Sequence, residues 1–251
     1  MTGIVTLCSS SDANSSLVIN GERLALIDAG ASAKTILQKV RELGFDKENI
    51  EGIFITHEHS DHSKGICVLR KRLPDIPVYT SFGTASALGI SDVTLVACGE
   101  CISCAGLDFI PFHTPHDAAE SFGYVVYSGG EKSIGYCTDI GYVTSEIRES
   151  LSGCKVVVLE SNYDENMLML GSYPYELKRR IKSKKGHLSN EECDLFIEEL
   201  SKNGTEKIIL AHLSCENNMP ELALAGAKLA SCGRADVCVA PKKEPSEAYY
   251  A

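Results

Sequence analysis

The chain has no long hydrophobic run. None of its stretches approaches the roughly 18 consecutive apolar residues that a membrane-spanning helix needs. Residues 1–6 contain no basic segment followed by an apolar one, so we expect no signal peptide. Internal repeats and low-complexity segments are also lacking. These absences predict an ordinary globular protein with no membrane partner.

Basic residues are in the minority. The chain has 24 Lys and Arg against 34 Asp and Glu, which gives a formal net charge of −10. A protein with this balance is not expected to coat DNA through general charge attraction. Local charge at a site is a separate matter, because two bound divalent cations would add positive charge that the sequence count does not include.

The 11 cysteines cannot form a complete set of disulfides, because their number is odd. Without a secretion signal they predict free thiols in a reducing compartment, and we expect a cytoplasmic protein. Cys98, Cys101 and Cys104 have the spacing of metal ligands, but no fourth ligand is evident nearby. Two interpretations stay open for them: a structural metal site, or reduced thiols in or near a loop.

A length of 251 residues suffices for one large domain or two small ones. We predict a single domain over residues 1–251, with 242–251 as a loose tail. Apolar, β-rich runs predict strands over residues 2–7, 17–19, 23–27, 52–56, 78–80, 107–112, 122–128, 133–138, 156–160, 207–210 and 235–239. Helices are predicted over 33–43, from the loop after 56 to residue 73, and over 84–88, 175–181, 190–200 and 220–230. This order favours an α/β fold with two sheets packed face to face and helices outside.

Histidine is scarce, with seven in the chain, yet three of the seven fall within six residues. The segment reads His57-Glu58-His59-Ser60-Asp61-His62 and follows the predicted strand 52–56. Such a cluster would repel on protonation and lose hydrogen bonds on burial, whereas imidazole and carboxylate together suit divalent metals. His57 and His59 share one face of an extended backbone, and Asp61 and His62 can face a second ion. A two-metal site is the favoured interpretation, and a solvated polar turn is the alternative.

Three further residues complete a plausible ligand set. His116, Asp139 and His212 each follow a predicted strand, although any one of them alone would more often be structural. Ligands at strand ends gather along one edge of the sheets. We predict the following assignment: His57, His59 and His116 hold one ion, Asp61, His62 and His212 hold the other, and Asp139 bridges them. The expected cofactors are two divalent metal ions, zinc or manganese, with iron a weaker match.

These motifs, together with Asp28-Ala29-Gly30, resemble the metallo-β-lactamase superfamily over most of the chain. Finer features are similar to its YycJ/WalJ branch, and they lie at Gly21-Glu22 and at residues 115–118, 159–164, 167–168, 177–181, 186–190, 211–214 and 217–218. The resemblance implies an αββα sandwich of two mixed sheets, a dinuclear site, and nuclease or phosphodiesterase activity. The cysteine cluster at 98–104 is not part of the expected pattern.

The predicted nucleophile is a hydroxide that bridges the two metals, since metal coordination lowers the pKa of water to about 7. His187 favours a phosphodiester substrate, because it follows a basic run in an otherwise acidic chain; a solvated surface is the plain alternative for that run. Resemblance to RNA-processing and cyclic-phosphodiesterase members implies that His187 is a general acid or phosphate contact, with Ser189 and Asn190 as hydrogen-bond donors. We predict Asp61 and His187 as catalytic residues.

Other polar residues have structural interpretations. We expect Asp28 to pin residues 57–62, the metal loop, by hydrogen bonds. His113 is expected to be structural, and Glu160 and Asp164 to orient ligands. The gap from Asp139 to His187 is too short for the inserted cap domain of larger nucleases of this superfamily, so we expect a compact enzyme. Together with His187, this favours a DNA or RNA exonuclease or another phosphodiesterase as the function. The alternatives are a thioester or lactone hydrolase, a di-iron redox enzyme that would need a flavin domain, and a non-catalytic binding protein.

Overall fold

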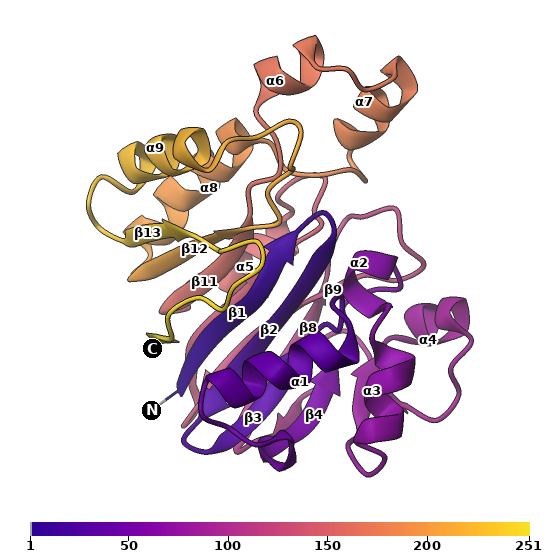
Figure 1. The fold of residues 1–251 in the computed structure, drawn as a ribbon. Coiled ribbons are helices and arrows are strands. Elements are labelled where there is room, and N and C mark those ends of the chain that lie inside the picture. The colour runs from indigo at the N-terminus through magenta and orange to yellow at the C-terminus, as the bar shows by residue number, and fades with distance from the viewer. Residues whose placement is uncertain (1) are drawn as a thin grey trace.

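The computed structural model describes residues 2–251, which form two seven-stranded sheets packed face to face (Figure 1). The first sheet has the order β14-β1-β2-β3-β4-β5-β6. Its strands are β1 (Thr2–Ser10), β2 (Ala13–Asn20), β3 (Arg23–Ile27), β4 (Ile50–Phe54), β5 (Val78–Thr80), β6 (Thr94–Leu95) and β14 (Tyr249–Tyr250). The strands from β14 to β3 pair antiparallel, and those from β3 to β6 pair parallel.

The second sheet has the order β13-β12-β11-β10-β9-β8-β7. Its strands are β7 (Ile102–Cys104), β8 (Leu107–His113), β9 (Phe122–Ser128), β10 (Glu131–Cys137), β11 (Val156–Glu160), β12 (Lys207–Ala211) and β13 (Asp236–Val239). The strands from β7 to β10 pair antiparallel, and those from β10 to β13 pair parallel. Because β8, β10, β11 and β12 run in one direction, their carboxyl ends meet at one edge of this sheet.

Helices cover the outer face of each sheet (Figure 1). On the first sheet, α1 (Ala33–Glu42) and α3 (Ile66–Arg72) bury Ile36, Val40 and Leu69 against the strands. On the second sheet, α5 (Ser145–Leu151), α8 (Asn190–Lys202) and α9 (Pro220–Ser231) bury their apolar faces in the same way. The predicted arrangement of two face-to-face sheets with helices outside is confirmed.

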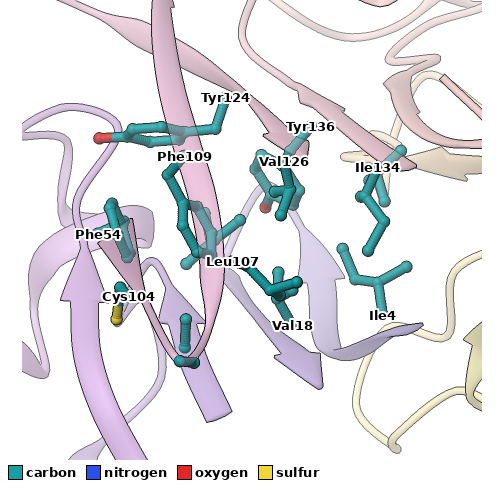
Figure 2. Close-up of a cluster of buried hydrophobic side chains, with 14 of the residues drawn as sticks. Ile4, Val18, Phe54, Cys104, Leu107, Phe109, Tyr124, Val126, Ile134 and Tyr136 are labelled. Carbon is teal, nitrogen blue, oxygen red and sulfur yellow. The ribbon is translucent and has the colours of Figure 1, made fainter. Parts of the chain in front are cut away.

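The main core lies between the two sheets (Figure 2). Phe54 of β4 stacks on Phe109 of β8, with ring centroids 4.2 Å apart, and on Tyr79 of β5 at 4.7 Å. Such offset stacking adds about 0.5–1.5 kcal/mol per pair to the burial of the rings themselves. Residue Cys104 also belongs to this core, which leaves it enclosed by apolar neighbours. This packing fixes β4 and β8 in place, and the candidate site begins just after these two strands.

The remaining helical segments are short, with three to seven residues each. They are α2 (Ser60–Ser63), α4 (Phe82–Leu88), α6 (Glu165–Leu170), α7 (Tyr175–Ile181) and the 3₁₀ turn η1 (Lys47–Asn49). Helices α6 and α7 form a projection beyond the two sheets (Figure 1). The segment between Asp139 and His187 contains only α5, β11, α6 and α7 among regular elements, which agrees with the expected lack of a large cap domain.

The helix predicted to run up to residue 73 is divided into α2 and α3. The division occurs at Gly65, whose amide donates to the carbonyl of Ala29 at 2.8 Å. A Cβ at Gly65 would lie 2.2 Å from the carbonyl oxygen of Ala31, so only glycine allows this close approach. The chain therefore turns where the metal loop is tied to the first sheet.

The C-terminal tail, expected to be loose over 242–251, is instead tied to the edge of the first sheet. Strand β14 pairs antiparallel with β1, and Tyr250 lies opposite Gly3. The amide of Ser246 donates to the carbonyl of Thr6 at 2.9 Å. Without β14, the edge of β1 would expose unpaired backbone groups, and the tail pairs with them. The tail is therefore held in place and is not loose as predicted. Within residues 2–251 there is also no helix with the length and apolar character to cross a membrane.

Candidate metal centre

The predicted ligands converge where strands of both sheets end. The metal loop follows β4, His116 follows β8, Asp139 follows β10 and His212 follows β12. Asp139 and His212 have left-handed φ angles of 57°, and Asp28, after β3, has 62°. Non-glycine residues seldom adopt this conformation, and strained backbone of this kind concentrates at functional sites. The sharp turns bring these side chains together, and both Asp28 and Asp139 lie beside His62.

The first group consists of His57, His59 and His116, whose ligand atoms lie within 4.8 Å of one another. His59 Nδ1 and His116 Nε2 face each other at 3.2 Å. His57 Nε2 is buried and has no hydrogen-bond partner within the described chain. Burial, followed by the charge of His62, holds the pKa of His57 well below its ordinary value, so its ring stays neutral with a free lone pair. Three converging nitrogens, of which His57 Nε2 has no hydrogen-bond partner within the described residues, fit a bound cation.

The second group consists of Asp61, His62 and His212. Asp61 Oδ2 lies 3.3 Å from His62 Nε2 and 3.2 Å from His212 Nε2. Burial opposes the charge of Asp61, but hydrogen bonds from His212 and His62 outweigh it and lower the pKa of this carboxyl. Burial likewise opposes the charge of His212, whereas Asp139 and other carboxylates raise its pKa to about 10. Cations that bind here would take the place of these protons.

Asp139 lies between the two groups. Its Oδ2 is 3.0 Å from His62 Nε2, without the geometry of a hydrogen bond. Its Oδ1 is 3.5 Å from His212 Nε2 and 3.7 Å from His116 Nε2. Burial opposes its charge, yet His212 and His62 hold its pKa well below the ordinary range. A carboxylate centred among imidazoles of both groups has the position of a bridging ligand, and the buried clusters are consistent with a dinuclear site.

Two buried carboxylates orient histidine rings of the site through their Nδ1 atoms. Asp28 accepts from His62 Nδ1 at 2.7 Å and from the amide of Thr56 at 2.8 Å, so it pins the metal loop as expected. Glu160 Oε1 accepts from His212 Nδ1 at 3.0 Å and from His187 Nδ1 at 2.8 Å. Such partners fix the ring tautomer, and the Nε2 atoms of His62 and His212 then lie beside Asp61 and Asp139. Asp164, by contrast, caps helix α6 and does not orient a ligand.

Several residues that support the site were missed by sequence reasoning. Asn14 Nδ2 lies 3.2 Å from Asp61 Oδ2 and 3.1 Å from His62 Nε2. Ser9 Oγ accepts from the amide of His212 at 2.8 Å. Both residues fall in the serine-rich stretch between residues 8 and 16, whose composition is typical of a turn. Most of this stretch belongs instead to β1 and β2. Polar residues that are buried on strands need partners, and this burial, which the structure reveals, connects Ser9 and Asn14 to the site.

His187 faces the same space as the ligands. A cavity of about 260 Å³ is lined by Ser11, His59, Ser60, Asp61, His116, Asp139, Arg180, His187 and His212. The side chain of His187 is 20% exposed, and Arg180, from the basic run, is fixed by Asp117, whose Oδ2 lies 2.5 Å from Arg180 Nε. The cavity therefore brings a spare imidazole and a guanidinium to the edge of the ligand cluster.

Ser189 and Asn190 do not line this cavity. Ser189 Oγ accepts from the amide of Glu192 and caps α8, and Asn190 Oδ1 accepts from Ser161 Oγ at 2.7 Å. Both side chains are buried because they start a helix that packs on the second sheet. His113 lies at the exposed end of β8, beside the ring of Phe122, in agreement with a structural role.

The cysteine cluster separates in the fold. Cys104 is buried in the main core, whereas Cys98 and Cys101 are exposed. Cys98 Sγ donates to Glu146 Oε1 at 3.1 Å. Burial, followed by that carboxylate, raises the pKa of Cys98 to about 11. The candidate metal groups within residues 2–251 contain only His, Asp and Glu, so the geometry supports reduced thiols here.

Comparison with known proteins agrees with this geometry. Residues 23–213 match the family model described as Beta-lactamase superfamily domain. The exodeoxyribonuclease YycJ of Bacillus anthracis is 36% identical over 224 residues, covering 86% of this chain and 84% of YycJ. The exodeoxyribonuclease WalJ of Streptococcus pneumoniae is 35% identical over 227 residues, covering 86% of this chain and 83% of WalJ. The resemblance to the YycJ/WalJ branch is thereby confirmed.

A solved structure supports the fold independently. The metallo-β-lactamase fold protein YhfI from Bacillus subtilis is similar with a TM-score of 0.77, covering 98% of this chain and 100% of that chain. The two sequences are only 14% identical, so this likeness concerns the fold alone. The predicted αββα sandwich is confirmed.

Proposed function

Because this chain belongs to the metallo-β-lactamase superfamily, we propose that it is a dinuclear metal-dependent hydrolase that degrades DNA from a strand end. One observation carries the choice of phosphodiester: His187 and Arg180 line the same cavity as His59, Asp61, His116, Asp139 and His212. A proton donor and a fixed cation beside a metal cluster suit an anionic ester with a leaving oxygen. The names of the relatives YycJ and WalJ, both exodeoxyribonucleases, support the same substrate class.

The proposed ligand assignment follows the geometry of the donor groups. His57, His59 and His116 would hold one ion, and Asp61, His62 and His212 would hold the other. Asp139 would bridge them from its position among His62, His116 and His212. When bound, the two ions would lower the pKa of water to about 7 and so supply a nucleophile at neutral pH. Zinc and manganese both suit such a set of imidazoles and carboxylates.

His187 would hold the proton that the leaving oxygen needs. Its Nδ1 is committed to Glu160 Oε1 at 2.8 Å, so Nε2 is the atom free to donate. The buried Glu160 carboxylate would also fix the orientation of the His187 ring through this hydrogen bond. Since Glu160 contacts His212 as well, one carboxylate would align the proton donor with the metal ligands.

Arg180 and Asp61 would complete the site. Arg180 is fixed by the Asp117 carboxylate and lines the cavity, where its guanidinium would bind a non-bridging phosphate oxygen. Asp61 uses Oδ2 toward His62 and His212, which leaves Oδ1 to accept a proton from the attacking water.

We further infer that residues 1–251 act as a single domain, because both sheets contribute to this one cavity.

A substrate comparison tests the proposal. The metal-loaded protein is incubated with end-labelled single- and double-stranded DNA, with RNA, and with a thioester and a lactone. Each reaction contains zinc, manganese or a chelator. We expect DNA to be shortened progressively from an end, with activity lost in chelator.

Thioester hydrolysis is the second candidate function, because the same ligands would serve it. A thioester hydrolysed far more efficiently than any nucleic acid, as judged by kcat/KM, would overturn the phosphodiesterase proposal and leave the metal centre intact. Internal cleavage of DNA without shortening from the ends would contradict the exonuclease part alone.

A further inference from the structure

A second cavity lies beside the metal cavity, on the side of α6, α7 and α8. It encloses about 640 Å³, a volume within the usual range for small-molecule sites. Its lining residues are Gly141, Tyr142, Tyr163, Glu165, Lys182, Lys184, Ser189, Glu191 and Glu192. None of these residues belongs to the metal centre.

The two cavities share their walls. One wall is the loop after β10, in which Asp139 faces the metal cavity and Tyr142 lines the second one. The other is the segment from α7 to α8, in which Arg180 and His187 line the metal cavity while Lys182 and Lys184 line the second. Asp139 and Tyr142 are three positions apart, so their α-carbons are separated by at most about 11 Å.

The shared walls are packed tightly against each other. A Cβ at Gly141 would lie 2.3 Å from the carbonyl carbon of Lys184, so the two segments touch through their backbones. The amide of Gly141 donates to the carbonyl of Pro115, next to His116, at 2.9 Å. A group bound beside Tyr142 is therefore held at a fixed distance from the metal ligands.

The second cavity offers an aromatic ring under a cation. The side chain of Tyr142 is 39% exposed, and the Nζ atom of Lys184 lies 5.6 Å from the centroid of its ring. Tyr163 contributes a second, buried ring to the lining. Exposed aromatic rings are the surfaces on which single-stranded nucleic acids stack their bases.

Its charge argues against a second phosphate. Three carboxylates, those of Glu165, Glu191 and Glu192, line the cavity against two lysines, and Lys182 is already paired with Glu165. A phosphate would meet net repulsion there, whereas a flat, uncharged ring with amino groups could stack on Tyr142 and donate to the carboxylates. The chemistry of the cavity thus suits a nucleobase.

We propose that this cavity is a nucleobase subsite, in which Tyr142 stacks on the base of a nucleotide next to the scissile phosphate. This inference rests on the proposed function and names its substrate form: a strand whose terminal bases are unpaired. A paired base is already stacked inside its duplex, so the enzyme would act on single-stranded ends or on ends that fray. Tyr142 would act as a substrate-binding residue, separate from the catalytic His187.

The test is a two-way comparison of the protein ring and the substrate base. Steady-state kinetics are measured for wild type, Tyr142→Ala and Tyr142→Phe on a single-stranded oligonucleotide and on the same strand with abasic residues at both ends. We expect Tyr142→Ala to raise KM for the intact strand roughly 5- to 150-fold, with little change in kcat. Tyr142→Phe keeps the ring and should stay within about two-fold of wild type. On the abasic strand, the penalty of Tyr142→Ala should disappear.

Tyr250→Ala serves as the matched control, because Tyr250 is 54% exposed on β14 and lies outside both cavities. A Tyr142→Ala enzyme that binds the intact strand as well as wild type does would overturn the inference while the proposed function stands. An equal KM penalty on the intact and abasic strands would also overturn it, since the ring would then act without a base. A wild-type enzyme that cleaves no nucleic acid would instead overturn the proposed function and, with it, this subsite.

Discussion

At the residue scale, the site is defined by which nitrogen of each histidine ring is free. Asp28 and Glu160 engage the Nδ1 atoms of His62, His187 and His212. The Nε2 atoms of His62 and His212 then lie beside the carboxylates of Asp61 and Asp139. The sequence could predict the candidate ligands, because three histidines and an aspartate within six residues are hard to accommodate without a bound cation. It could not identify the pairing of Glu160 with two histidines at separations of 27 and 52 positions. That pairing exists only after β11 and β12 lie side by side.

Replacing His187 tests the proton-donor role directly. In His187→Ala, the rate of DNA hydrolysis should fall by about 10²–10⁴-fold, the usual effect of losing a general acid. Metal content should stay at the wild-type level, because His187 is outside the proposed ligand set. The measurements are kcat on end-labelled DNA and metal content by elemental analysis.

His113→Ala is the matched control, because His113 is exposed on β8 and outside the cavity. It should retain wild-type activity. Loss of metal from His187→Ala, or an unchanged rate, would refute the assignment.

At the element scale, the candidate site is built from residues that follow the ends of strands. Strands of five to seven residues rich in apolar, β-branched side chains, such as β9, β11 and β12, were predictable because their composition matches their burial. Short elements such as α6 and β14 were not, because isolated segments of that length are marginal and depend on tertiary contacts. The same limit applies to Ser9 and Asn14, since their strand pairing, not their composition, makes them part of β1 and β2.

Gly30 tests how closely the metal loop is held to the first sheet. A Cβ at this position would lie 1.6 Å from the carbonyl oxygen of Asp61, so Gly30→Ala must displace the loop. We expect a loss of about 1–3 kcal/mol in the free energy of unfolding, together with weaker metal binding. Urea unfolding and metal titration measure the two effects.

The control for Gly30 is Gly21→Ala, a turn glycine whose added Cβ would have no neighbour within 4 Å. It should cost about 1 kcal/mol through its φ of +62° and leave metal affinity unchanged. Equal metal affinity in Gly30→Ala and wild type would show that the loop tolerates displacement.

Asp194 on α8 makes the packing of α8 on α9 pH-dependent. A Cβ at Gly226 of α9 would lie 2.2 Å from Asp194 Oδ2, so the carboxylate is held close to the neighbouring helix. Burial, followed by the charge of Glu191, raises the pKa of Asp194 from 3.8 to about 6. A carboxyl whose pKa is raised on folding contributes stability below about pH 4 that is lost as the pH rises through 6. The folded state therefore carries a cost near neutral pH.

Asp194→Asn should remove this cost. Because the group is only half-buried, we expect the variant to gain at most about 1 kcal/mol over wild type at pH 7.5, and less at pH 5. Urea unfolding at the two pH values measures the difference. A difference that does not change with pH, or a variant less stable than wild type at pH 7.5, would contradict this role of Asp194.

At the scale of the whole molecule, the two sheets supply different candidate ligands to one site. The metal loop comes from the first sheet, whereas His116, Asp139 and His212 come from the second. Their side chains could be predicted to meet, because strand ends of a face-to-face sandwich share an edge. The second cavity beside Tyr142 could not be predicted, since it depends on the backbone contact of Gly141 with Lys184.

Metal binding should therefore couple the two sheets and stabilise the whole fold. A ligand that binds only the folded state at about 100 times its Kd adds roughly 2.7 kcal/mol. For a chain of this length we expect the melting temperature to rise by roughly 5–10 °C when the metal-free protein is loaded with zinc or manganese. Differential scanning calorimetry measures the shift, and magnesium at the same concentration is the control. A melting temperature that does not respond to zinc or manganese would contradict a site shared by both sheets.

The most direct test of the central claim is a metal titration followed by DNA hydrolysis. Metal-free protein is titrated with manganese or zinc, and the rate of shortening of end-labelled single-stranded DNA is recorded at each step for wild type and Asp139→Asn. We predict a rate that saturates at two ions per chain in wild type, with loss of both activity and the second equivalent of metal in Asp139→Asn. Full activity in chelator, or an Asp139→Asn variant that binds two ions and cleaves DNA at the wild-type rate, would contradict the dinuclear mechanism.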